Sequence, residues 1–204
     1  MPRHDLPEVA MVGRSNVGKS SLINALVRQK VARTSAAAGK TRLANFYRVA
    51  RGRVRVELID LPGYGYSRGG AGDFDELARA VFERGVSALL LVDARHPGLE
   101  ADCSAWKWIR EGAAAAVVVA TKIDKLARGQ RIRALGELES VFQEAVLPVS
   151  AVTGEGLDEL WKLIDKLANS SKPKRRAHDK GSSHNQSNRP SKPHEATEPP
   201  PRKG

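Results

Sequence analysis

The feature that most constrains this chain is a glycine-rich loop between an apolar run and an amphipathic segment. Residues 13–20 have the sequence Gly-Arg-Ser-Asn-Val-Gly-Lys-Ser, a G-x-x-x-x-G-K-S spacing. The run 7–12 before it predicts a buried strand, and the segment 21–27 after it has apolar residues at helical spacing. The glycines let backbone N–H groups point inward, and the helix start adds a positive dipole end. This context predicts a phosphate-binding loop.

Two side chains at the end of the loop have defined tasks in such a site. Lys19 reaches the outer phosphates as a positive charge, and the Ser20 hydroxyl can ligate Mg²⁺. The alternative is a glycine turn that precedes a helix by coincidence, and the full eight-residue pattern disfavours it. We therefore predict that the chain binds a nucleoside triphosphate.

Strand and helix patterns alternate along the first 169 residues. Strands are predicted at 7–12, 46–50, 54–60, 87–93, 113–121 and 146–149, and helices at 21–27, 74–84, 101–110, 128–142 and 157–167, with loops at 28–43 and 61–70. Asp73 is the predicted cap of the 74–84 helix. The pattern predicts one α/β domain over residues 1–169, with a mostly parallel six-stranded sheet and helices on both faces. The strands at 46–50 and 54–60 form its one antiparallel edge hairpin.

Residues 170–204 have a different composition. They contain no Val, Ile, Leu, Phe, Trp or Tyr, and hold nine Lys or Arg against three Asp or Glu. Such a segment buries too little apolar area to offset the entropy of ordering it. We predict a disordered basic tail.

Composition excludes several classes of protein. No window approaches the roughly 18 apolar residues of a membrane span, and the N-terminus lacks the apolar region of a secretory signal. The single cysteine, Cys103, excludes an internal disulfide framework and fits a reducing compartment. We predict a cytoplasmic monomer without a membrane partner.

Charge is also unevenly placed within the predicted domain. No acidic residue lies between Glu8 and Glu57, in a chain of net charge +11. This basic interval fits a nucleotide site or a polyanionic partner, and a merely solvated face explains the part after Arg48 equally well.

Polar residues follow the predicted strands, at the sheet edge where ligands bind in such folds. Asp60 and Gly63 form D-x-x-G around Leu61 and Pro62. The carboxylate can hold Mg²⁺ through water, and the Gly63 N–H can approach a γ-phosphate closely. Thr41, in the loop 28–43, could complete the metal shell when a γ-phosphate draws the loop in.

A second polar motif, Thr121-Lys122-Ile123-Asp124, follows the strand 113–121. A carboxylate at Asp124 accepts hydrogen bonds from N1–H and the 2-amino group of guanine, and adenine offers neither donor. A strand-end loop with a helix cap is the alternative. Ser150 and Ala151 follow the last strand and can offer a backbone N–H to the guanine O6.

Together these motifs resemble the EngB (YihA/YsxC) family of ribosome-biogenesis GTPases, within the translation-factor-like GTPases. The resemblance covers roughly residues 7–167. It rests on residues 13–20, Gly-Lys-Thr-Arg-Leu at 39–43, Asn-Phe at 45–46, Asp-Leu-Pro-Gly-Tyr-Gly-Tyr at 60–66, Arg-His-Pro at 95–97 and Thr-Lys-Ile-Asp at 121–124. It implies a P-loop GTPase fold and a role in assembling the large ribosomal subunit, with ribosomal RNA as partner, and hence in normal cell division.

The resemblance also implies a GTP and GDP site at the matching positions. These are Gly13, Arg14, Ser15, Asn16, Val17, Gly18, Lys19 and Ser20; Gly39, Lys40, Thr41, Arg42 and Leu43; Asp60, Leu61, Pro62 and Gly63; and Thr121, Lys122, Ile123, Asp124, Val149, Ser150 and Ala151. Ser20, Thr41 and Asp60 form the implied Mg²⁺ set. Lys19, Thr41 and Gly63 are the residues expected to act in hydrolysis.

The sequence departs at Ala38 and Thr121 from patterns common in such GTPases, and Tyr64, which belongs to the family signature at 60–66, bears on catalysis. Ala38 replaces a frequent Pro before the 39–41 segment, and Thr121 replaces the Asn of GTPases at large, with the expected loss of an amide tether to the phosphate loop. Tyr64 stands where many GTPases carry a water-orienting Gln, so we predict slow intrinsic hydrolysis that a partner accelerates.

Asn16 has two interpretations. By resemblance, its side-chain oxygen helps to bind K⁺ beside the phosphates; alternatively, it braces the loop through a hydrogen bond. Two rival functions also remain. A small-molecule phosphotransferase would need an acceptor lid and a base, which the sequence does not show. An RNA-binding protein with a purely structural nucleotide would show no ribosome-stimulated GTP turnover.

Overall fold

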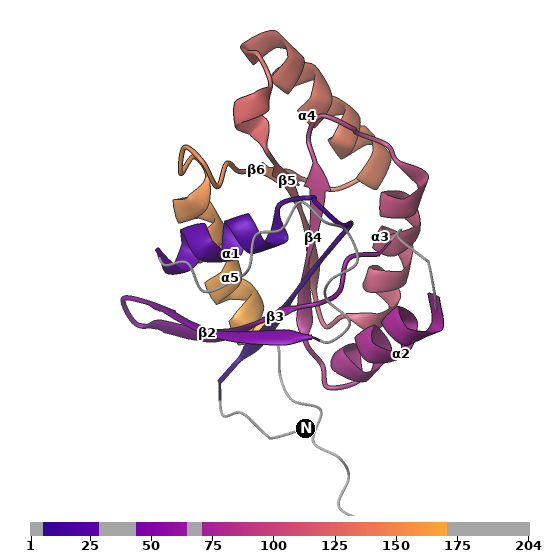
Figure 1. Cartoon of the computed structure of the whole chain (residues 1–204), viewed down its shortest axis with the longest axis vertical. Helices are drawn as coiled ribbons and strands as arrows, with labels where there is room; N and C mark the ends of the chain where they lie inside the picture. Colours follow the sequence, from indigo (N-terminus) through magenta and orange to yellow (C-terminus); the bar gives the residue numbers. More distant parts are fainter. Residues whose placement is uncertain (1–5, 29–43, 65–70, 171–204) are drawn as a thin grey trace, which may run out of the picture. The chain divides into compact units, whose positions relative to one another are not determined.

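The computed structural model describes residues 6–28, 44–64 and 71–170 (Figure 1). The loop residues Gly39, Lys40, Thr41, Arg42 and Leu43 and the predicted tail from residue 171 onward lie outside the described residues. What was predicted for these residues therefore stays a prediction.

The described chain forms a six-stranded sheet with the order β2-β3-β1-β4-β5-β6. Its strands are β1 (Glu8–Gly13), β2 (Asn45–Arg51), β3 (Val54–Asp60), β4 (Ser87–Asp93), β5 (Ala116–Thr121) and β6 (Val146–Pro148). β2 and β3 pair antiparallel, and all other neighbours pair parallel. The predicted mostly parallel sheet with one antiparallel edge hairpin is confirmed.

Helices cover both faces of this sheet, as predicted (Figure 1). They are α1 (Lys19–Val27), α2 (Ala71–Phe82), α3 (Glu100–Gly112), α4 (Arg128–Phe142) and α5 (Leu157–Ser170), with a short 3₁₀ turn, η1, at Ile123–Lys125. α1 and α5 pack with one core cluster, and α2, α3 and α4 pack with the other.

The alternation of side chains along each strand explains the two cores. In β1, Val9 and Met11 belong to the cluster beneath α1 and α5, whereas Ala10 and Val12 belong to the cluster on the other face. All four are fully buried. Because successive side chains point to opposite faces, a central parallel strand must be apolar throughout. This is why the sequence predicts its strands as continuous apolar runs.

Several predicted boundaries were wrong. α2 begins at Ala71, so Asp73 lies inside the helix and does not precede it as a cap. β5 begins only at Ala116, because residue Ala113 still caps the end of α3 through its N–H, which donates to the Ile109 carbonyl. α5 continues to Ser170, one residue into the predicted tail. On α4, Ile132 has the spacing of a core residue but is 65% exposed.

Candidate functional site

The chain reverses its direction of sheet growth at β1, which lies between β3 and β4 and pairs parallel with both. In open α/β sheets, ligands bind beyond the carboxyl ends of the strands at such a point. The glycine-rich loop 13–20 begins at the carboxyl end of β1 and leads directly into α1. The segments after β3, β5 and β6 leave the same edge, so the topology brings the predicted motifs together.

Glycine is required at two positions of the loop. A Cβ at Gly13 would lie 2.8 Å from Val17 Cγ1 and 2.9 Å from the Leu91 carbonyl oxygen. Gly18 has φ of 110°, a backbone conformation that disfavours side chains. No side chain caps the N-terminus of α1 after Gly18, and its first turn holds no acidic residue. The first N–H groups of α1 are thus open to an anion.

Lys19 supplies a positive charge inside this loop. Its Nζ donates to the Gly13 carbonyl over 3.3 Å. Burial lowers the pKa of Lys19, and the nearby Asp60 carboxylate opposes that shift. A buried ammonium gains from an anionic ligand, because the ligand replaces the water that burial removed.

Asp60 ends β3 and is 4% exposed. Its Oδ1 has no hydrogen-bond partner among the residues that the structure describes. Burial raises the pKa of Asp60 to about 6, and Lys19 opposes this rise. An orphaned buried oxygen of this kind fits a cation, so Asp60 and Ser20 are suitable residues for the predicted Mg²⁺.

The candidate metal site differs from one built wholly of protein ligands. Within the described ranges, no three His, Cys, Asp or Glu residues come together in a way that could hold a metal ion. Mg²⁺ commonly takes one or two protein oxygens and the phosphates of a bound nucleotide. Ser20 and Asp60 at the phosphate loop match that type of donor set, and Thr41 lies outside the described residues.

The D-x-x-G segment lies against the phosphate loop. The Leu61 N–H donates to the Met11 carbonyl over 3.2 Å, and Tyr64 forms a parallel bridge with Arg14. A Cβ at Gly63 would lie 2.6 Å from the Ser15 nitrogen. Only glycine permits this approach to the phosphate loop. The contact of the Gly63 N–H with a γ-phosphate stays a prediction.

The Thr-Lys-Ile-Asp segment at 121–124, the candidate guanine motif, is attached to the phosphate loop by two of its side chains. The Thr121 hydroxyl lies 2.7 Å from the Val17 carbonyl and 3.0 Å from the Val92 carbonyl. Lys122 Nζ donates to the Asn16 carbonyl. The expected loss of an amide tether at Thr121 is thus compensated, because the Thr121 hydroxyl itself reaches a carbonyl of the phosphate loop.

Asp124 and Ser150, both in the candidate base site, are joined by a hydrogen bond. Ser150 Oγ donates to Asp124 Oδ1 over 2.7 Å and accepts the N–H groups of Val152 and Thr153 at 3.2 and 3.1 Å. The hydrogen bond from Ser150 lowers the pKa of Asp124. Asp124 is therefore a fixed, ionised acceptor, which suits a partner that offers two N–H donors. Val149 precedes this pair and is buried, and Ala151 follows it half-buried.

Asp93 is a site residue that the sequence patterns did not indicate. It ends β4, is 4% exposed, and accepts from Arg95 Nη2 at 2.7 Å and from Lys122 Nζ at 2.9 Å. Burial raises the pKa of Asp93, but the bonds from Arg95 and Lys122 outweigh burial and hold it below its usual range. The Arg-His-Pro signature at 95–97 was the available signal, since its arginine lies two residues after Asp93 and can pair with it.

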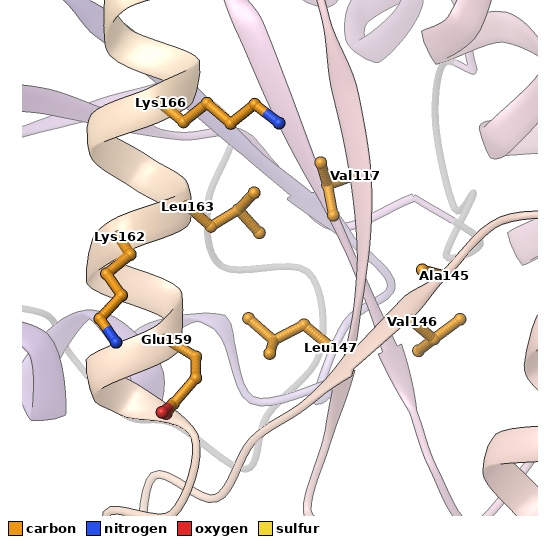
Figure 2. A pocket seen from close by; sticks show the side chains of 8 residues that line it. All are labelled: Val117, Ala145, Val146, Leu147, Glu159, Lys162, Leu163 and Lys166. Carbon is orange, nitrogen blue, oxygen red and sulfur yellow. The ribbon is translucent and has the colours of Figure 1, made fainter.

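One open groove lies elsewhere on the domain. It runs between α5 and the strands β5 and β6, and Figure 2 shows its lining side chains. They are Val117, Ala145, Val146, Leu147, Glu159, Lys162, Leu163 and Lys166. No predicted site residue is among them, so the groove is separate from the candidate nucleotide site.

Known proteins with similar sequences are GTP-binding proteins by name. The sequence model of a family described as "50S ribosome-binding GTPase" matches residues 8–122. The "Probable GTP-binding protein EngB" of Pelotomaculum thermopropionicum is 42% identical over 176 residues, covering 80% of this chain and 86% of that protein. The protein of the same name from Alkaliphilus metalliredigens is 37% identical over 178 residues, covering 81% and 84%.

Solved structures share the fold. Era in complex with MgGDPNP and part of the 16S ribosomal RNA superposes with a TM-score of 0.70 at 28% identity, covering 80% of this chain and 57% of that chain. A probable GTP-binding protein engB gives a TM-score of 0.61 at 23% identity, covering 79% and 98%. Fold and loop arrangement thus define a P-loop GTPase domain. The sequence similarity narrows the class further: the chain belongs to the EngB family of GTP-binding proteins.

Proposed function

We propose that this protein is a GTP-binding switch that hydrolyses GTP slowly and acts in assembly of the large ribosomal subunit. The observation that carries the nucleotide part is the Asp124 carboxylate, which Ser150 holds at 2.7 Å. Thr121, three residues earlier, contacts the phosphate loop at Val17. One short segment thereby links base recognition to the phosphate site.

Each part of the site has a role in this proposal. The N–H groups of residues 13–20 and the start of α1 bind the phosphates, and Lys19 stabilises negative charge on the outer ones. Gly63 directs its N–H at a γ-phosphate. Mg²⁺, when bound, neutralises charge between the phosphates, and Ser20 and Asp60 would hold it, with Thr41 from the segment 39–43.

Slow hydrolysis follows from the residue after Gly63. The Tyr64 hydroxyl donates to Asp102 at 2.7 Å, so it is not available to orient an attacking water. We therefore assign the acceleration of hydrolysis to a partner, and the charge stabilisation to Lys19 and the loop N–H groups.

K⁺ remains the alternative source of additional charge. The described residues provide no hydrogen bond to the side chain of Asn16, which is exposed, so the bracing role gains no support from them. Faster GTP turnover in KCl than in NaCl at matched ionic strength, abolished in Asn16→Ala, would establish the cation. Equal rates in both salts would leave Asn16 without that role.

The ribosomal part of the proposal rests on membership of the EngB family and on the charge of the chain. The edge hairpin β2–β3 carries Arg48, Arg51, Arg53 and Arg55, and residues 171–204 add nine basic against three acidic residues. Ribosomal RNA is a partner of matching charge. We place the protein in the cytoplasm as a monomer, with an indirect role in cell division. As a separate finding, none of the described helices has the length and apolar character of a membrane span.

The test measures nucleotide selectivity and ribosome binding together. Wild type should bind GTP and GDP far more tightly than ATP, and Asp124→Asn should lose tenfold or more in GTP affinity while gaining xanthosine nucleotide binding. The amount of protein that co-sediments with 50S particles should differ between GTP and GDP. Equal affinity for ATP and GTP would contradict the base assignment. Phosphate transfer to a small acceptor, or the absence of ribosome-stimulated turnover, would favour the rival functions.

A further inference from the structure

A buried carboxylate on α3 joins the phosphate loop to the segment after Gly63. Asp102 is 1% exposed and accepts two hydrogen bonds on the same oxygen, Oδ1. The Tyr64 hydroxyl donates to it over 2.7 Å, and Arg14 Nε donates over 3.0 Å. The three residues come from three separate elements and are up to 88 positions apart in sequence.

Backbone contacts place this network directly beside the phosphate site. Arg14 and Tyr64 form a parallel bridge, and the adjacent Gly63 lies so close to Ser15 that a Cβ would be 2.6 Å from the Ser15 nitrogen. The residue whose N–H would face a γ-phosphate is thus immediately next to the residue that Asp102 holds. Movement of the Tyr64 side chain would displace Gly63 from the loop.

The electrostatics keep the Tyr64 hydroxyl protonated. Burial and the charge of Asp102 raise the pKa of the Tyr64 hydroxyl, which therefore remains a donor. Burial raises the pKa of Asp102, and the bonds from Tyr64 and Arg14 oppose this shift. A buried carboxylate that had no such donors would be costly to the fold.

α3 provides a rigid base for the contact. Trp106 and Ile109 on the same helix are buried in the core, and the Trp106 indole donates to the Phe142 carbonyl of α4. Asp102 therefore cannot follow the loop freely. The Tyr64 hydroxyl, which donates to Asp102, is thereby held in a fixed position relative to the sheet.

We propose that Asp102 is a positioning residue for GTP recognition, acting through Tyr64 to hold Gly63 where its N–H meets a γ-phosphate. This inference rests on the proposed GTP-binding function. GDP lacks the γ-phosphate and gains nothing from Gly63, so the network contributes to the affinity for GTP and not to that for GDP. It serves preorganisation: the donor is in place before the phosphate arrives.

The test compares binding of GDP and of a non-hydrolysable GTP analogue to the full chain, with Mg²⁺, by titration calorimetry. Tyr64→Phe removes one oxygen from the network, and Asp102→Asn keeps the shape but removes the charge. Both should lower the affinity for the GTP analogue by about five- to tenfold and leave the GDP affinity within about twofold. The double variant should lose no more than the larger single effect, because both changes act on one contact.

A matched control separates positioning from general stability. Ser87→Ala also removes one buried hydroxyl, which donates to the Leu167 carbonyl over 3.1 Å at the opposite end of β4. It should lower the melting temperature without changing the ratio of the two affinities. An unchanged ratio in Tyr64→Phe and Asp102→Asn, or an equal loss for both nucleotides, would overturn the positioning role alone. A wild type that binds neither nucleotide would overturn the proposed function itself.

Discussion

At the residue scale, Asp60 gives the sharpest prediction because it is ionisable, buried and without a described partner. Burial raises its pKa to about 6, whereas the unfolded chain should titrate near 3.8. Between these values the folded state binds more protons than the unfolded state, so the contribution of Asp60 to stability falls as pH rises and its full cost is present above about pH 6.

Asp60→Asn should therefore stabilise the nucleotide-free protein at pH 7.5 but not at pH 4. The gain should not exceed about 3 kcal/mol, from about 1.4 kcal/mol per pKa unit, and it is reduced because Lys19 loses an opposite charge. Urea unfolding of both proteins across this pH range measures the difference. Glu137→Gln, an exposed carboxylate on α4, is the control that should show no such pH dependence. A difference that does not vary with pH would contradict the burial argument.

The same scale shows how far the sequence could predict the site. The motifs around Gly13, Gly18, Gly63 and Asp124 predicted segments that meet at one edge of the sheet, and the parallel strand order brings those segments there. Their contacts with a nucleotide stay a prediction. Asp102 was not predictable in this way. It is one acidic residue in an amphipathic helix, and its burial against Tyr64 depends on how α3 packs on the sheet, which no local pattern specifies.

At the element scale, the β2–β3 hairpin is the candidate surface for RNA. β2 is an edge strand, and Arg48 and Ala50 face the same side as Arg55, which pairs with Ala50. All of these arginines are exposed, but Arg48 pairs with the buried Glu57 at 3.3 Å, whereas the described residues give Arg53 and Arg55 no ion pair. Two exposed guanidinium groups near the tip suit phosphate contacts.

Reversing the two charges by Arg53→Glu and Arg55→Glu should weaken binding to 50S particles or ribosomal RNA tenfold or more. The slope of log affinity against log salt should become shallower by about 1.5, from roughly 0.7–0.9 per phosphate contact. Arg128→Glu with Arg133→Glu on α4 makes the same charge change at another exposed site and is the control. If both double variants weaken binding equally, net charge and not the hairpin determines the interaction.

The elements themselves were predicted well where apolar periodicity is long and unbroken. β3 at Val54–Asp60, β4 at Ser87–Asp93 and α4 at Arg128–Phe142 have the predicted bounds. The predicted start of α2 was wrong because glycine-rich sequence before Asp73 has a low helix propensity, and propensity alone does not decide where a helix begins. The exposed Ile132 shows that spacing places a side chain on a face without deciding whether another element covers it.

At the scale of the whole molecule, the predicted division at residue 170 remains a proposal. Within the part of the chain that the structure describes, the core cluster beneath α1 and α5 ends with Leu167 and Ala168 on α5. Residues 171–204 contain none of the large apolar side chains that could extend either cluster. Composition is the basis of this proposal, because such a division depends on the amount of apolar area and not on its arrangement.

Truncation after Ser170 tests that division and the role of the tail together. Removing residues 171–204 takes away nine basic and three acidic residues but no large apolar side chain. The melting temperature and the GTP affinity should therefore barely change. Binding to ribosomal particles should weaken, most strongly at low salt, because counterion release scales with the number of phosphate contacts. A full-length chain whose tail Lys and Arg residues are replaced by Gln should behave like the truncated chain. If truncation unfolds the protein or removes nucleotide binding, while the neutral tail does not, then the tail packs on the domain and the proposed boundary is wrong.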